Sequence, residues 1–269
     1  MSVNASSPYL DSDLLSLPLL LELAPGHGCL AHIPILPGLC FRADDLAAVQ
    51  VTAFAQITLY SRWLLDHNAA DLTRETAALV RRVCTGPLSG IEILETERRA
   101  GSPVWLSGNP AVLFQHDCRR LSDAAVAAHL RFIRLVLTWT RQLVVPLSAS
   151  QLAWKPAPSQ RSIADTLTHI GNCIWWYCSR IDNDLPEPED PPGEWPGDRI
   201  DRLLDAAATY LREVPTDART MVHVPKRFLT TDPAEQWTHS KVCRRQAEHV
   251  WEHLPGIHRV VENVLEAGV

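Results

Sequence analysis

The sequence has no excess of positive charge, because 31 aspartates and glutamates outnumber 25 lysines and arginines and give a formal net charge of −6. Affinity for duplex DNA that does not depend on base sequence comes from several lysine or arginine contacts to phosphates. An acidic chain offers no such general attraction to nucleic acid or to anionic lipid. We therefore expect neither a nucleic acid nor a membrane among the partners of this protein.

The sequence also lacks a C-x-x-C pair, although it contains seven cysteines. This odd number of scattered cysteines fits reduced thiols in a cytoplasm better than a disulfide framework or a cysteine-rich zinc module. The most apolar early stretch, "LLSLPLLLELAPG", follows no basic segment and contains Glu22 and a proline. It predicts neither a signal peptide nor a membrane span, and we expect a cytoplasmic protein.

The first part of the chain is typical of a small β-sheet followed by a helix, over residues 1–70. Short apolar runs within residues 14–41 are separated by proline and glycine, as strands are. The spacing of apolar residues then becomes helical, and Asp44 or Asp45 can cap that helix. Residues 71–117 mix a helical stretch with a stretch that could hold strands, and we interpret them as a connector.

Residues 118–269 predict a mostly helical domain. The apolar spacing and the capping residues indicate four helices, which run from Ser122 to near Pro146, from Ser162 to about Ile181, over 198–214, and from about Lys241 to Glu266. The acidic, proline-rich segment 182–198 cannot be helical and is expected to be an exposed loop. Four such helices describe a four-helix bundle, so the expected fold class is α+β.

Three of the eleven histidines lie where they could share one ion. His249 and His253 are four residues apart and therefore project from one face of the last helix, about 6 Å apart at Cβ. His169 lies beside the apolar stripe of the second helix and therefore faces the interior of the helical bundle or the mouth of the bundle. A divalent metal ion needs at least three such ligands, but the spacing alone also fits a hydrogen-bonded core histidine and two polar residues on a solvent-exposed face.

Two segments that carry these histidines resemble the DinB-like family. "LAWKPAPSQRSIADTLTHIGNCIWWYCSRI" is similar to the Trp-Lys-Pro loop and second helix of that family, and "HVWEHLPGIHR" matches the histidine pair of its fourth helix. The resemblance covers roughly residues 118–266. It implies an up-down-down-up four-helix bundle with one divalent metal ion, zinc, nickel or a similar ion, bound by His169, His249 and His253.

The first part of the chain has a looser resemblance. "LLLELAPGHGCLAHIPILPGLCFRADDLAAVQVTAFAQITLYSRWL" is similar to the HicB-like antitoxin fold, in which a turn of the type "LPG" precedes a long helix. The sequence contains no ribbon-helix-helix or helix-turn-helix pattern, so the regulatory role of those antitoxins does not carry over.

The DinB-like resemblance implies a metal-dependent enzyme of the thiol-transferase or hydrolase type, acting on a small-molecule substrate with a low-molecular-weight thiol. Trp176 and Arg245 lie within two turns of the candidate ligands and are candidates for binding that substrate. Two alternatives stay open: a non-catalytic, metal-stabilised bundle whose N-terminal domain mediates protein–protein interaction, and a purely structural fusion. The sequence does not distinguish a monomer from a homodimer.

Overall fold

Two units make up the chain in the computed structural model, Met1–His116 and Asp117–Val269. The structure describes residues 14–24, 26–85, 90–101, 111–227 and 235–267. The two units differ in secondary structure as expected, since the first combines a sheet with helices and the second is mostly helical. The α+β fold class predicted from the sequence is confirmed.

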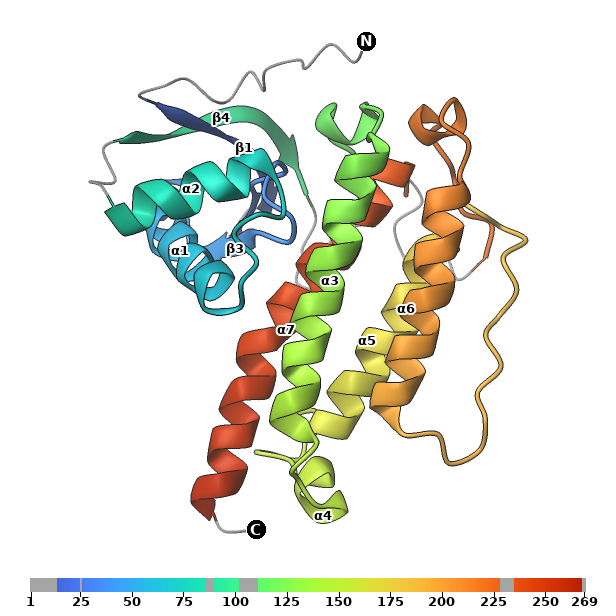
Figure 1. Ribbon diagram of the computed structural model, residues 1–269. Coiled ribbons are helices and arrows are strands. Elements are labelled where there is room, and N and C mark those ends of the chain that lie inside the picture. Colours follow the sequence, from blue (N-terminus) through green and yellow to red (C-terminus); the bar gives the residue numbers. More distant parts are fainter. Residues whose placement is uncertain (1–13, 25, 86–89, 102–110, 228–234, 268–269) are drawn as a thin grey trace. The chain divides into compact units, whose positions relative to one another are not determined.

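The first unit is built around a four-stranded sheet in the order β3-β2-β1-β4 (Figure 1). The strands are β1 (Leu15–Ala24), β2 (Gly28–His32), β3 (Cys40–Ala43) and β4 (Ile91–Ala100). Strand β1 pairs antiparallel with β2 and parallel with β4, and β2 pairs antiparallel with β3. The expected connector 71–117 therefore contributes the fourth strand of this sheet.

Strand β1 is central and almost fully buried, which explains its near-continuous leucines. It also contains Pro18, which has no backbone N–H to donate to a neighbouring strand. At Pro18 the strand pairs only with β4, because pairing with β2 begins at Leu20. The proline thus lies where one side of the strand has no partner strand and a missing donor costs little.

Two helices complete the first unit. Helix α1 (Leu46–Asp66) begins after Asp45, whose carboxylate accepts a hydrogen bond of 2.8 Å from the Ala48 N–H. It packs against β2 and β3, and α2 (Arg74–Thr85) packs against α1 and β1. The predicted helix start at Asp44 or Asp45 is thus confirmed at Asp45.

In its described residues, the second unit contains four long α-helices and one short α-helix (Figure 1). They are α3 (Asp123–Val144), α4 (Ala149–Ala153), α5 (Ile163–Cys178), α6 (Pro196–Glu213) and α7 (His239–Ala267). Helix α3 packs against α6 and α7, and α5 packs against the same two helices. Among the described residues, no helix combines the length and the apolar character that crossing a membrane requires.

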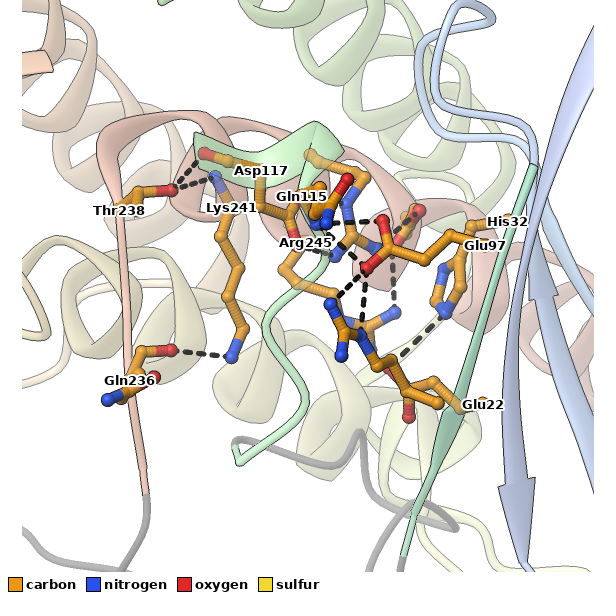
Figure 2. A network of polar contacts seen from close by, with 12 residues as sticks. Glu22, His32, Glu97, Gln115, Asp117, Gln236, Thr238, Lys241 and Arg245 are labelled. Atoms are coloured by element: carbon orange, nitrogen blue, oxygen red, sulfur yellow. Dashed lines mark hydrogen bonds and ion pairs between the residues drawn. The ribbon is translucent and has the colours of Figure 1, made fainter. Parts of the chain in front are cut away.

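The start of α7 is fixed by polar contacts of its own unit (Figure 2). The Thr238 hydroxyl donates to the backbone carbonyl of Asp117 at 2.6 Å and accepts from the Lys241 N–H at 3.1 Å. The Lys241 ammonium is buried, donates to the carbonyl of Gln236 at 2.7 Å and lies 4.2 Å from the centre of the Trp237 ring. These contacts set where α7 begins, and so which residues of the helix face α5.

An ion-pair network holds the next turns of α7. The Arg244 guanidinium donates two parallel hydrogen bonds of 2.8 Å to the carboxylate of Asp117 and a third, of 3.0 Å, to Glu248. All three side chains are at most 4% exposed. Buried charges persist only when they are paired and hydrogen-bonded, and here each has at least one partner of opposite charge.

The acidic loop between α5 and α6 contains no helix or strand over 182–195, as its prolines predict. The prediction that residues 182–198 cannot be helical is wrong for 196–198, which form the first turn of α6, because a proline is tolerated at the start of a helix. The loop is nevertheless held at several points. The Trp175 indole N–H donates to the carbonyl of Pro186 at 2.7 Å, and Asp190 and Glu194 pair with arginines of α6. Part of its negative charge is therefore balanced locally.

Candidate metal centre

Helix α5 positions the first histidine. Its start is defined by a capping box, in which the Ser162 hydroxyl accepts from the Asp165 N–H and the Asp165 carboxylate accepts from the Ser162 N–H. The apolar stripe of the helix is buried, including Leu167 and Ile170 on either side of His169. His169 itself is half-buried, beside this stripe, as expected from the sequence.

Helix α7 supplies the other two histidines. Val250, Leu254 and Ile257 are buried on this helix, and His249 is buried among them. His253 is half-buried one turn later, on the same face as His249. The i, i+4 spacing therefore places both imidazoles toward α5 rather than toward solvent.

The three imidazoles converge on one point. His249 Nε2 lies 3.1 Å from His169 Nε2 and 3.1 Å from His253 Nε2. One ring nitrogen of each histidine lies within 4.8 Å of the others, and the rings meet edge to face. Within the described part of the chain, this group contains only imidazoles.

The surroundings keep these imidazoles neutral at neutral pH. Burial, followed by the positive charge of Arg161 and of His253, lowers the pKa of His169 to about 4. Burial and then Arg161 lower the pKa of His253 to about 4. Burial, followed by the charges of its two histidine neighbours, holds the pKa of His249 well below its usual range.

Both the donor type and the spacing fit a divalent metal ion. Metals bind the neutral form of histidine, which is the form that this environment favours. Tetrahedral zinc with Zn–N bonds of about 2.0–2.1 Å separates its ligand nitrogens by about 3.3 Å, close to the 3.1 Å observed for two of the pairs. Imidazole ligands suit zinc, nickel and cobalt rather than magnesium or calcium.

Cys173 and Tyr177 lie beside the centre, and Arg161 acts on it through its charge. Cys173, one turn after His169, places its sulfur 3.8 Å from both ring nitrogens of that histidine, and burial raises the pKa of its thiol to about 12. The Tyr177 ring lies edge-on to His249, with the ring centres 5.8 Å apart. Arg161 precedes the α5 cap, and its charge reaches all three imidazoles. The sequence gives no signal for Arg161, because this residue lies outside the helix and its apolar periodicity.

The two side chains that we expected to bind substrate already have partners within the protein. Trp176 is half-buried, with the Arg180 guanidinium 4.4 Å from its ring centre and the Trp237 ring 5.6 Å away. Arg245 is buried and pairs with Glu248 at 2.7 Å and with Glu252 at 3.3 Å. A substrate-binding role for Trp176 and Arg245 stays a prediction.

Comparison with known proteins agrees with the geometry of the second unit. Residues 134–255 match the family model of the DinB superfamily, a segment that runs from α3 into α7 and contains His169, His249 and His253. The match does not extend to the first unit, for which the HicB-like resemblance stays a prediction. No curated protein and no solved structure matched the chain. The C-terminal unit of this protein is accordingly DinB-like, with the three histidines of its candidate metal centre inside the matched segment.

Proposed function

We propose that His169, His249 and His253 bind one divalent metal ion and that the DinB-like unit is a metal-dependent enzyme of the thiol-transferase or hydrolase type. The observation that carries the proposal is the convergence of three imidazole nitrogens from two helices, with two of the separations at 3.1 Å. Buried polar groups normally form hydrogen bonds in which a donor faces an acceptor. Three neutral imidazoles whose nitrogens face one another can all direct a lone pair at the same cation.

The number of ligands favours catalysis over a purely structural site. Structural zinc sites usually have four protein ligands, whereas catalytic sites have three and keep a position open. When bound, the ion would supply Lewis acidity that lowers the pKa of a water or thiol ligand. Zinc, nickel or cobalt is the expected ion, and a low-molecular-weight thiol is the proposed cosubstrate.

The chain's own side chains would shape this open position. Tyr177 and the buried face of α5 exclude water from one side of His249. Without a bound ion, burial raises the pKa of the Cys173 thiol to about 12. Its sulfur lies 3.8 Å from the ring nitrogens of His169, and we assign the nucleophile to the cosubstrate.

The activity can be tested by a thiol-adduct screen. Zinc-, nickel- and cobalt-loaded protein would be incubated with low-molecular-weight thiols and with electrophiles such as epoxides and alkyl halides, and adducts would be detected by mass spectrometry. We expect adduct formation that depends on the metal and is lost in His249→Ala. Adducts that form equally fast with metal-free protein would contradict the proposal.

A second candidate function is a metal-stabilised unit without catalysis, in which the N-terminal unit binds a protein partner. The observation that favours it is that the three ligands connect α5 to α7, so a bound ion would cross-link two helices. The same screen separates the two candidates. Metal that raises the melting temperature while every thiol and electrophile pair stays unreacted would favour this second function.

A further inference from the structure

A buried glutamine links the two helices that carry the candidate ligands. Gln246 lies one turn before His249 on α7 and is 2% exposed. Its side-chain amide nitrogen donates to the backbone carbonyl of Ile174 at 2.9 Å and to the sulfur of Cys178 at 3.3 Å. Both acceptors belong to α5, so one side chain ties α7 to α5 close to the histidines.

The oxygen of the same amide has no partner. Gln246 Oε1 is buried and accepts no hydrogen bond from any described residue. Exchanging the oxygen and nitrogen of the amide would not help, because Oε1 would then face the carbonyl oxygen of Ile174 and two acceptors would meet. A buried acceptor without a donor lowers the free energy of unfolding. The amide therefore joins the two helices while it leaves one unsatisfied group in the core.

The link lies where it can control the distance between the ligands. His249 follows Gln246 on α7 and contacts His169, which precedes Ile174 on α5, so the two helices run antiparallel here. At a rise of about 1.5 Å per residue, the amide lies only about 4.5 Å from His249 along the axis of α7. The Nε2 atoms of His169 and His249 are 3.1 Å apart, and a functional site tolerates displacements of only about 0.5 Å. A small slide of α5 along α7 would thus change the separation of the ligands.

We propose that Gln246 is a positioning residue that fixes α5 against α7 at the three-histidine centre and thereby sets the affinity and the coordination geometry of the metal ion. The inference rests on the proposed metal site. The amide acts through His169 and His249, whose helices it joins. Without the amide the metal-free protein should keep its stability, because the loss of two hydrogen bonds is offset by the removal of an unsatisfied acceptor.

The test compares the full-length wild-type protein with Gln246→Met, which keeps the length of the side chain and removes the amide. The affinity for cobalt is measured together with the visible absorption of the cobalt-saturated protein, whose intensity depends on the coordination number, and with the melting temperature of metal-free protein. We expect Gln246→Met to bind cobalt roughly tenfold more weakly and to have an altered absorption spectrum. Its melting temperature should stay near that of the wild type. A merely structural role would leave the spectrum of the saturated protein unchanged.

His239→Met is the matched control. His239 is 1% exposed on α7, and its Nε2–H donates to the carbonyl of Leu211 on α6 at 2.9 Å. Its Nδ1 is buried and has no partner among the described residues. The variant thus also loses a buried hydrogen bond between helices and an unsatisfied nitrogen, but it does so more than two turns away from His249. It should keep the wild-type affinity for cobalt and the wild-type spectrum.

Cys178→Ala is a milder variant for the case in which Gln246→Met does not fold. It removes one of the two acceptors and should lower the affinity for cobalt roughly twofold to threefold. Wild-type affinity and spectrum in Gln246→Met, or in Cys178→Ala where only that variant folds, would overturn the role of Gln246. Equal losses in Gln246→Met and His239→Met would also overturn it. A wild-type protein that binds no cobalt would instead overturn the metal site itself, and this inference with it.

Discussion

The lowered pKa values of the histidines in the candidate centre make the stability of the metal-free protein depend on pH. An unfolded histidine binds a proton near pH 6.5, whereas folded His169 and His253 do so only near pH 4. Between these values the unfolded chain binds more protons than the folded chain, so stability falls as the pH is lowered. We expect the melting temperature of chelator-treated protein to drop from pH 6.5 to pH 4.

The control for this prediction is the double variant His169→Gln, His253→Gln. It keeps the other buried titratable groups, including His129 and His239, whose pKa values burial also lowers. Its melting temperature should fall less steeply over the same range. Identical pH profiles for the two proteins would show that the imidazoles of His169 and His253 are not desolvated as the structure indicates.

At the residue scale, the sequence indicated the three ligands but not their surroundings. The i, i+4 spacing of His249 and His253 and the place of His169 beside an apolar stripe follow directly from helical periodicity. The ion pairs of Arg245 and the reach of Arg161 depend on side-chain directions and on which helices are neighbours. Periodicity carries no information on either, so the sequence pointed to Arg245 and gave no signal for Arg161.

Helix α7 should depend strongly on its buried ion pairs. Replacing Arg244 with methionine would leave the carboxylates of Asp117 and Glu248, 0% and 1% exposed, without this partner. Breaking a buried pair typically costs roughly 3–5 kcal/mol, because the remaining charge stays buried. We expect a loss of this size in the free energy of unfolding measured with urea.

Exposed Arg259→Met on the same helix should change stability by less than about 0.5 kcal/mol. If Arg244→Met does not fold, Asp117→Asn offers a milder form of the same test, because it keeps the shape of the side chain and removes one charge. A loss below about 1 kcal/mol in both Arg244→Met and Asp117→Asn would contradict the network described for α7.

The acidic loop should contribute little to stability despite its ion pairs. Asp190 and Glu194 pair with Arg199 and Arg202, but Asp190 is 53% exposed and Arg202 is 37% exposed. Exposed pairs are worth roughly 0.2–1 kcal/mol each. The double variant Asp190→Asn, Glu194→Gln should therefore unfold within about 2 kcal/mol of the wild type in urea, and a larger loss would show that the loop is a packed element.

At the element scale, the long helices were easier to predict than strand pairing, a short helix or a proline within a helix. The starts at Ser122 and Ser162 were predictable because a capping hydroxyl precedes an apolar periodic run. Strand β4 could not be assigned to a partner, since its parallel pairing with β1 joins residues more than 70 positions apart. Helix α4 was missed because five residues are too few for a periodic signal. Pro255 lies inside α7, where a proline normally ends or kinks a helix, yet the helix continues.

For the whole molecule, the charge balance predicts no general affinity for nucleic acid. Binding that does not depend on base sequence comes from lysine and arginine contacts to DNA phosphates. A net charge of −6 opposes such binding, because the protein as a whole repels the phosphate backbone. In an electrophoretic or fluorescence assay at low salt, the full-length protein should not bind duplex DNA at micromolar concentration. Micromolar binding that weakens steeply with added salt would contradict this prediction and would favour a DNA-binding, regulatory role for the N-terminal unit.

Three histidines from two helices are proposed to share one metal ion. The most direct measurement is metal content by mass spectrometry, together with the melting temperature, for protein purified without a histidine tag and titrated with zinc, nickel or cobalt. An ion that binds only the folded chain at 100 times its Kd adds about 2.7 kcal/mol, or roughly 5–10 °C for a unit of this size. We expect one ion per chain in the wild type and in the control His258→Ala on α7, and most of it lost in His169→Ala, His249→Ala and His253→Ala. A wild-type protein that stays metal-free, with no shift in melting temperature at micromolar metal, would show that these histidines do not bind a metal ion.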